Sequence, residues 1–163
     1  MPELDPGAVV RILNRHGVRY VVIGGIAAQI HDLPVPATVD IDITPARDHK
    51  NLERLANAFD ELEAGLYTAD ERGSWFPRTP VEDWAQYDTL HLMTIHGPLD
   101  LVFTPDGAPH GYDDLAGAAV RLMLGDEAVL VITPATWEAL KQASGRAKDL
   151  EHLDRYHEGR GRD

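Results

Sequence analysis

The chain has 163 residues, 44% of them apolar and 26% charged, which is typical of one soluble globular domain and excludes collagen-like, low-complexity and fully disordered classes. It has no cysteine, so disulfides, thiolate nucleophiles, zinc–thiolate sites and iron–sulfur clusters are excluded. The formal net charge is −12, with −13 in residues 1–140 and +1 in residues 141–163, whereas a general polyanion binder would be basic.

Helical and strand patterns alternate in the first part of the chain. Asp5 is placed to cap a helix that has Pro6 at its first position and ends at Gly17. The pattern then predicts a buried strand over 18–23, a break at Gly24 and Gly25, and a short helix over 26–32. After an extended passage at Pro34 and Pro36, it predicts a strand over 39–44 and a helix that begins at Asp48.

The second part begins with an irregular stretch, residues 61–87, and ends in helix. Four aromatic side chains of this stretch could stack a base or bind a partner, and we expect them to cover the core: Trp75, Phe76, Trp84 and Tyr87. The later elements predicted are a hairpin of strands 89–95 and 99–104 with a turn at 96–98, a helix over 112–119, a strand over 129–132, and a helical region from Thr133 that Gly145 kinks or divides. The apolar stripe of that last region is predicted to contain Leu140, Ala143, Ala147, Leu150 and Leu153.

Together these elements predict an α/β fold, a single domain over 1–157 with a mixed β-sheet flanked by helices and a helical C-terminus. Residues 158–163 are expected to form a flexible polar tail. The first residues lack the charged head and apolar run of a signal peptide, and no window approaches roughly 18 apolar residues. We therefore expect a cytoplasmic protein with no membrane partner.

Three carboxylates form the most informative pattern. Asp40 and Asp42 stand two apart on a predicted strand, so they share one face, while Val39, Ile41 and Ile43 are expected to face the core. Two carboxylates on one face repel each other unless a cation lies between them, and Mg²⁺ (or Mn²⁺) is the usual choice beside phosphates. If the strand that contains Asp100 lies alongside, three carboxylates converge on a metal site. The alternative is a solvated strand face.

Gly24 and Gly25 follow a buried strand and precede a short helix. Glycines at such a turn let backbone N–H groups approach an anion, and a triphosphate fits that description. The alternative is that they only turn the chain.

These residues carry a family resemblance. The stretch V-V-I-G-G-I-A-A-Q-I-H, followed by A-T-V-D-I-D-I and G-P-L-D-L-V-F, resembles the minimal nucleotidyltransferase (polymerase-β-like) superfamily. The segment T-P-A-T-W-E-A-L-K-Q-A-S-G-R-A-K-D-L-E-H-L looks like the Lys…Arg-x-Lys-Asp segment of its AbiEii-type branch, which includes toxins of toxin–antitoxin systems. One departure is Pro36, which stands two residues before Thr38, where many relatives carry Arg.

The resemblance implies metal-dependent transfer of a nucleoside monophosphate from an NTP to an acceptor hydroxyl, with release of pyrophosphate. It implies that Asp40, Asp42 and Asp100 are the catalytic metal ligands, and that Asp100 also helps to activate the hydroxyl. Gly24, Gly25, Thr38, Lys141 and Lys148 would bind the nucleotide. Lys141 and Lys148 stand seven apart, so on one continuous helix they would share a face; the alternative for both is to lie over the core with their charges in water.

Three hypotheses follow for the function. The first is a toxin that modifies an RNA acceptor such as tRNA and has a cognate antitoxin. The second keeps the chemistry but has a small-molecule acceptor of the antibiotic kind, which is often cationic and would be attracted by an acidic cleft. The third is a non-catalytic nucleotide-binding module of the same fold. The spacing of the eight histidines disfavours zinc, and P-loop, Rossmann and serine-hydrolase motifs are absent.

Overall fold

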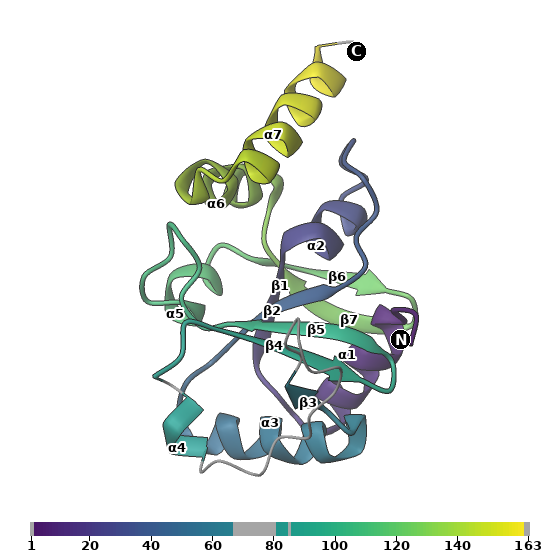
Figure 1. Ribbon diagram of the computed structural model, residues 1–163, viewed down its shortest axis with the longest axis vertical. Coiled ribbons are helices and arrows are strands. Elements are labelled where there is room, and N and C mark those ends of the chain that lie inside the picture. The colour runs from purple at the N-terminus through teal and green to yellow at the C-terminus, as the bar shows by residue number, and fades with distance from the viewer. Residues whose placement is uncertain (1, 67–80, 85, 162–163) are drawn as a thin grey trace.

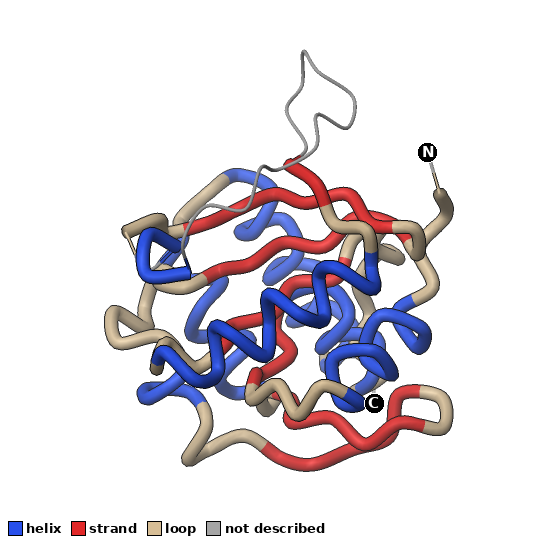
Figure 2. Tube along the Cα trace, turned by 90° about the horizontal axis from the view of Figure 1, so that it is seen from below, coloured by secondary structure: helices blue, strands red, loops and turns tan. Residues whose placement is uncertain are grey.

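The structure is a computed structural model that describes residues 2–66, 81–84 and 86–161. Within those residues seven strands form one mixed sheet in the order β3-β4-β5-β2-β1-β7-β6. Helices α1 and α3 lie on one face of the sheet, and α2 and α6 lie on the other (Figures 1 and 2). The fold is therefore a single α/β domain with a mixed sheet flanked by helices, as the sequence predicts.

The first five elements follow the predicted order. They are α1 (Pro6–Arg15), β1 (Tyr20–Ile23), α2 (Gly24–Ile30), β2 (Ile41–Pro45) and α3 (His49–Leu62). Asp5 caps α1 by accepting a hydrogen bond from the Ala8 N–H at 3.0 Å, and Asp48 caps α3 in the same way from Asn51. All four residues of β1 are buried, so this strand lies in the centre of the core.

The sheet brings distant parts of the chain together at β2. This strand pairs antiparallel with β1 and parallel with β5 (Gly97–Val102), and in the second pairing Asp42 lies directly opposite Asp100. Strand β1 in turn pairs parallel with β7 (Glu127–Val131) on its other side. The expected adjacency of the two aspartate-bearing strands is confirmed.

The start of β2 differs from the prediction. The strand begins at Ile41 rather than at residue 39, and Val39 is 75% exposed instead of facing the core. The physical reason is local: the Thr38 hydroxyl bonds the backbone N–H and carboxylate of Asp40, and this side-chain bonding competes with a strand ladder. Asp40 therefore lies in a bend before the strand, and its proximity to Asp42 comes from that bend and not from strand alternation.

The hairpin is confirmed, with a shifted turn. Its strands are β4 (Thr89–Thr94) and β5, and the chain turns at residues 95–96, so that Pro98 pairs with Met93 inside the ladder. Gly97, with φ of 104°, accommodates the turn, and the Thr94 hydroxyl accepts from the His96 N–H and donates to the Gly97 carbonyl.

The stretch before the hairpin contributes two short elements, β3 (Gly65–Leu66) and α4 (Val81–Trp84). Trp84 is buried and stacks on Phe59 with ring centroids 5.5 Å apart, which agrees with a core-covering role, whereas Tyr87 is partly exposed. Trp75 and Phe76 lie outside the described residues.

The segment after β5 was predicted wrongly. Only α5 (Tyr112–Leu115) is helical where a helix over 112–119 was expected, and an unpredicted strand, β6 (Val120–Leu124), forms a hairpin with β7. The signal was present: Val120, Leu122 and Leu124 alternate with other residues before a Gly-Asp turn, and that pattern is typical of a two-residue hairpin.

The C-terminal region is two helices, α6 (Pro134–Ser144) and α7 (Ala147–Arg160). Gly145 separates them with φ of 62°, as its position suggested. The predicted apolar stripe is largely wrong, because Ala143, Ala147 and Leu150 are exposed. Leu153 is buried as predicted and Leu140 is partly buried, and two residues outside the predicted stripe, Trp137 and Tyr156, are buried as well.

Helix α7 runs to Arg160, so it includes the first three residues of the predicted tail. No helix in the described parts of the chain has both the length and the apolar character needed to cross a bilayer.

Candidate active site

Three carboxylates converge where β2 and β5 lie side by side. Each of Asp40, Asp42 and Asp100 offers an oxygen within 4.8 Å of the others. Asp42 and Asp100 face each other across neighbouring strands, which are spaced by about 4.7–4.9 Å, and the bend at Thr38 brings in Asp40. The predicted convergence is therefore present in the structure.

Gly24 and Gly25 begin α2, where a break before the helix was predicted, and Gly24 packs directly against Asp42. A Cβ at Gly24 would overlap the Asp42 carboxylate, and the φ of 66° at this residue is unfavourable for any L side chain. A Cβ at Gly25 would lie 2.6 Å from the Thr38 Cβ. Glycine is thus required at both positions because the backbone runs against Asp42 on one side and Thr38 on the other.

Thr38 orients Asp40. Its hydroxyl oxygen lies 2.8 Å from the Asp40 Oδ1 and donates a hydrogen bond to it. The resemblance implied a nucleotide contact for Thr38, whereas the contact that the structure shows is the hydrogen bond that positions the Asp40 carboxylate.

Electrostatics favour a cation among the three carboxylates. Burial, followed by the negative charges of Asp40 and Asp100, raises the pKa of Asp42 to about 8, and the nearby Lys141 opposes that rise. Three carboxylate oxygens within a few ångströms are hard ligands of the kind that Mg²⁺ and Mn²⁺ prefer. The residues present therefore fit a divalent metal ion.

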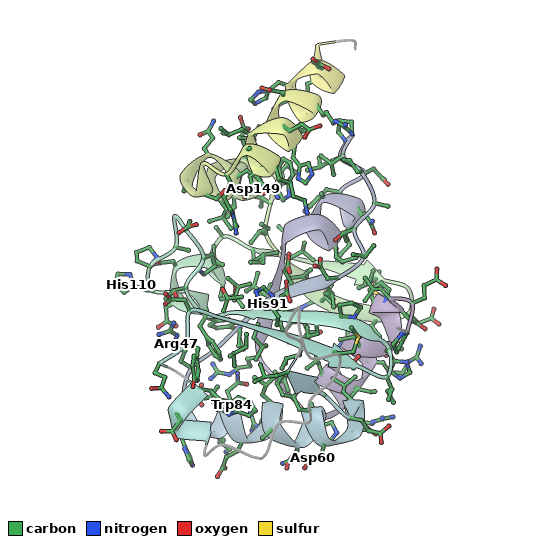
Figure 3. All side chains as sticks on the ribbon, viewed as in Figure 1. Arg47, Asp60, Trp84, His91, His110 and Asp149 are labelled. Atoms are coloured by element: carbon green, nitrogen blue, oxygen red, sulfur yellow. The ribbon has the colours of Figure 1, made fainter. Side chains whose placement is uncertain are left out.

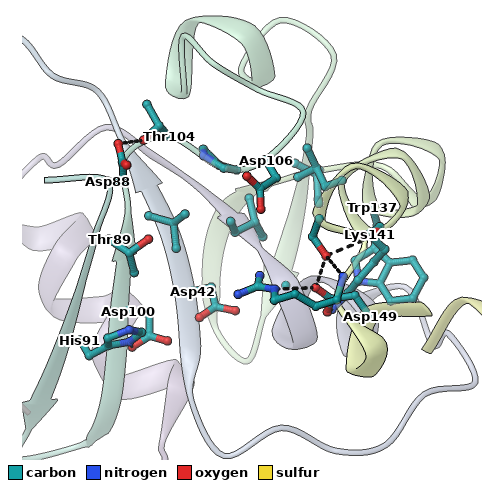
Figure 4. Close-up of a pocket in the computed structure, with 18 residues that line it drawn as sticks. Asp42, Asp88, Thr89, His91, Asp100, Thr104, Asp106, Trp137, Lys141 and Asp149 are labelled. Carbon is teal, nitrogen blue, oxygen red and sulfur yellow. Dashed lines mark hydrogen bonds and ion pairs between the residues drawn. The ribbon is translucent and has the colours of Figure 1, made fainter. Parts of the chain in front are cut away.

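Two adjoining cavities open onto the carboxylates. They share walls formed by Asp42, Asp100, Trp137, Lys141, Arg146 and Asp149. The first cavity, of about 300 Å³ (Figure 4), also contains Asp88, Thr89, His91, Thr104 and Asp106. The second cavity, of about 310 Å³, also contains Gly25, Thr38, Asp40, Lys148 and His152.

Lys141 is held over the site by a buried partner. Its Nζ lies 2.7 Å from the Asp149 Oδ1, and Asp149 also accepts hydrogen bonds from Ser144 and, at 3.2 Å, from Arg146. Burial by itself would raise the pKa of Asp149, but the hydrogen bonds from Lys141 and Ser144 outweigh burial and lower it. Asp149 lies at the junction of α6 and α7 (Figure 3), so it ties Lys141 to the start of the second helix.

Lys141 and Lys148 lie on different helices, so the continuous helix on which they would share a face does not form. Gly145 ends α6 after Lys141, and Lys148 belongs to α7. Both nevertheless line the second cavity together with Gly25, because the two helices fold back against each other. Pro36 lines the same cavity, and Arg146 and Lys148 supply positive charge there.

Sequence reasoning missed several residues of the site. Asp149 is not among the predicted site residues, yet it is 7% exposed and bonds Lys141. His91 lies on β4 with its Nδ1 2.8 Å from the Asp100 Oδ1, and it faces Asp100 because the hairpin turns at residues 95–96 and not at the predicted 96–98. Trp137 is buried in the shared wall, and no sequence signal separated it from an ordinary core residue.

No protein family model and no curated protein matches this chain. Among solved structures, the crystal structure of a candidate nucleotidyltransferase from Thermotoga maritima is similar, with a TM-score of 0.55, 16% sequence identity and 97% of each chain covered. The chain therefore has a nucleotidyltransferase-like fold. The AbiEii-type branch is a finer assignment that stays a hypothesis.

Proposed function

We propose that this protein is a metal-dependent nucleotidyltransferase that moves a nucleoside monophosphate from an NTP to an acceptor hydroxyl. The observation that carries the proposal is the cluster of three carboxylates within 4.8 Å at the junction of two cavities, one of which contains Lys148 and the Gly25 backbone. The fold of the solved neighbour supports the same class of reaction.

Each residue has a part in this proposal. Asp40, Asp42 and Asp100 would hold one or two Mg²⁺ or Mn²⁺ ions, which would neutralise charge on the reacting phosphate. Lys141 and Lys148, with the backbone at Gly24 and Gly25, would bind the triphosphate.

The proposed transfer is an in-line displacement at the α-phosphorus of the NTP. The acceptor oxygen forms a bond to the α-phosphorus, and the bond from that phosphorus to the bridging oxygen breaks. Pyrophosphate leaves with the electron pair, and the hydroxyl proton passes to the Asp100 carboxylate. Asp100 is suited to this task because it lies on the boundary of both cavities.

Calorimetry with Mn²⁺ alone tests the metal site. We expect the variant Asp40→Asn/Asp42→Asn to lose measurable affinity, because only one of the three carboxylates remains. The control Asp113→Asn/Asp126→Asn removes the same charge from exposed positions outside both cavities. Equal Mn²⁺ affinity in the parent and the site variant would overturn the proposal.

The toxin hypothesis rests on the resemblance to the AbiEii-type branch. It adds an RNA acceptor such as tRNA and a cognate antitoxin to the same chemistry. Mass spectrometry of tRNA after incubation with the protein, Mg²⁺ and each NTP would detect the added nucleotide as a fixed mass increase. Unmodified tRNA with every NTP contradicts this hypothesis and leaves nucleotidyl transfer to another acceptor intact.

Pyrophosphate release distinguishes an active enzyme from a non-catalytic nucleotide-binding module. Such a protein binds NTP and metal but releases no pyrophosphate with any acceptor. Pyrophosphate release above that of the Asp40→Asn/Asp42→Asn variant excludes it.

A further inference from the structure

Much of the positive charge in the second cavity is already paired. Lys141 and Arg146 both bind the same carboxylate, Asp149, at 2.7 and 3.2 Å. Lys148, the remaining lysine of this cavity, makes no ion pair within the described part of the chain. An NTP keeps negative charge after it has bound Mg²⁺, so a further cation in this cavity would strengthen its binding.

His152 faces the same cavity from α7. It lies one helical turn after Lys148, and residues four apart share a face of a helix. Both side chains line the second cavity together with Gly25, and His152 is the only histidine among the described residues that line it. The imidazole is therefore placed to contact a ligand that Lys148 contacts.

Helix α7 is held against this cavity near both of its ends. Asp149 bonds Lys141 and so ties the first turn of α7 to α6. Near the other end, Gly159 packs so closely on Pro34 that a Cβ would lie 2.5 Å from the proline Cγ. His152 lies between these two contacts, so the backbone that bears it is fixed beside the cavity.

A hydrogen bond defines the charge of the imidazole in the free protein. The Lys141 Nζ lies 3.4 Å from the His152 Nδ1. An ammonium group can only donate a hydrogen bond, so the Nδ1 accepts it and the ring proton is on the Nε2. The imidazole is therefore neutral, and a proton added at the Nδ1 would break this hydrogen bond.

The charged groups around His152 agree with a neutral ring. Burial, followed by the positive charges of Lys141 and Lys148, lowers the pKa of His152, and Asp149 and Glu151 oppose that shift. The other charged groups of the cavity are one cation between the two helices and the three carboxylates of the proposed metal site: Arg146, Asp40, Asp42 and Asp100. A triphosphate beside the two lysines would offset their charge and raise the pKa of the imidazole.

We propose that His152 is a further phosphate-binding residue, neutral in the free protein and protonated when the triphosphate of an NTP occupies the second cavity. This inference rests on the proposed function. The added proton comes from solvent and binds the Nδ1, while the Nε2 keeps its own. The imidazolium then donates to a phosphate oxygen, and Lys141 no longer donates to His152. Because binding takes up a proton, NTP affinity rises as the pH falls through the value at which the bound imidazole titrates.

NMR of the eight histidines measures this proton directly. The Cε1–H shift of each imidazole is followed against pH with Mg²⁺, in the absence and presence of a saturating α,β-methylene NTP, which cannot transfer its nucleotide. The four common bases are tested in turn, and the signal missing from His152→Asn identifies His152. We expect its pKa to lie below the ordinary 6.5 in the free protein and at least about one pH unit higher in the complex.

Two variants separate protonation from hydrogen bonding. In His152→Asn the amide oxygen can still accept from Lys141, but the side chain cannot be protonated. The control His157→Gln removes another histidine of α7, one that pairs with Glu138 outside both cavities.

Calorimetry with Mg²⁺ and the same analogue compares these variants with the parent. From about pH 8.5 to about pH 6, the affinity of the parent relative to His152→Asn should grow at least about three-fold, whereas His157→Gln should follow the parent. Asp42, with a pKa of about 8, changes metal binding over this range in all three proteins alike, so the ratio of affinities reports on His152.

The inference is overturned if the analogue leaves the pKa of His152 unchanged, or if the ratio of the two affinities is the same at both pH values. Failure of every analogue to bind the parent with Mg²⁺ contradicts the proposed function itself. Binding without uptake of a proton at His152 contradicts only the role of this residue.

Discussion

Glycine is required at position 24 for two separate reasons, the backbone φ angle and the lack of space for a Cβ atom. Its φ of 66° resembles the φ of 61° at Gly125, but a Cβ at Gly125 meets nothing within 4 Å, whereas a Cβ at Gly24 overlaps the Asp42 carboxylate. We predict that Gly24→Ala and Gly125→Ala both lose about 1–2 kcal/mol of stability from the unfavourable backbone angle. Only Gly24→Ala should also weaken Mn²⁺ binding in calorimetry, since it displaces Asp42, a proposed metal ligand. Parallel loss of metal affinity in both variants would show that general destabilisation is responsible.

Asp149 gives the stability of the protein a dependence on pH. Its pKa is lowered in the folded state, so the stability it contributes is present above the ordinary carboxyl pKa of about 3.8 and is lost as the pH falls toward the lower folded value. We predict that Asp149→Asn lowers the free energy of unfolding by about 1.5–3 kcal/mol near neutral pH, because hydrogen bonds to a charged group are lost. The difference from the parent should shrink at about pH 3.

Urea unfolding at the two pH values measures this effect. Asp154→Asn is the control, because Asp154 is an exposed carboxylate on the same helix. A pH-independent difference between Asp149→Asn and the parent would mean that packing, and not charge, makes Asp149 important.

At the scale of elements, α7 matters because it brings Lys148 to the second cavity. Lys148 is exposed, so Lys148→Ala should leave stability unchanged and weaken NTP binding with Mg²⁺ about ten- to a hundred-fold, the cost of one contact to a charged phosphate. Arg155→Ala on the same helix should bind NTP normally, since Arg155 pairs with Glu151 outside both cavities. Calorimetry that gives equal NTP affinity for Lys148→Ala and the parent would remove Lys148 from the site.

Lys141 requires a different expectation from the one that sequence alone suggests. If Lys141 only bound the nucleotide, Lys141→Ala would weaken NTP binding without effect on folding. In the structure it neutralises the buried Asp149, so Lys141→Ala leaves an unpaired buried carboxylate and should also destabilise the protein. Urea unfolding of this variant distinguishes the two expectations.

The sequence predicts those elements whose signals are local. The capped helices α1 and α3, the buried strand β1 and the hairpin of β4 and β5 each carry caps, periodicity or a turn within a few residues. The strand β6 was missed because Tyr112 to Ala119 was read as one helix and the alternation after it went unused. The start of β2 was misplaced because a side-chain bond from Thr38 to Asp40 has no periodic signature.

The sequence predicts some residues of the candidate site and not others. Asp42 and Asp100 follow from the pairing of two strands, and Gly24 from its place after β1. Asp149, Trp137, Asp88 and Asp106 could not be foreseen, because their positions depend on how α6 and the loop after β5 pack over the sheet. Such packing joins residues distant in sequence and leaves no local pattern.

For the molecule as a whole, the charge balance makes nucleotide binding depend on metal. Residues 1–140 carry −13, a balance that includes the three carboxylates of the site, and an NTP brings further negative charge. Binding to the folded state raises its stability by RT ln(1 + [L]/Kd), so NTP with Mg²⁺ should raise the melting temperature. NTP in EDTA should give a much smaller rise, and an equal rise in both conditions would contradict a metal-bridged site.

The parallel pairing of β1 with β7 has a consequence for folding during synthesis. Val22 in β1 pairs with Val131, so more than a hundred residues separate the two strands in the chain. Until β7 has left the ribosome, β1 presents an open edge of apolar residues, the kind of edge at which chains add to one another. Because such long-range pairing is slow to form, nascent chains that end before residue 131 should be the species most prone to aggregate and to require chaperones.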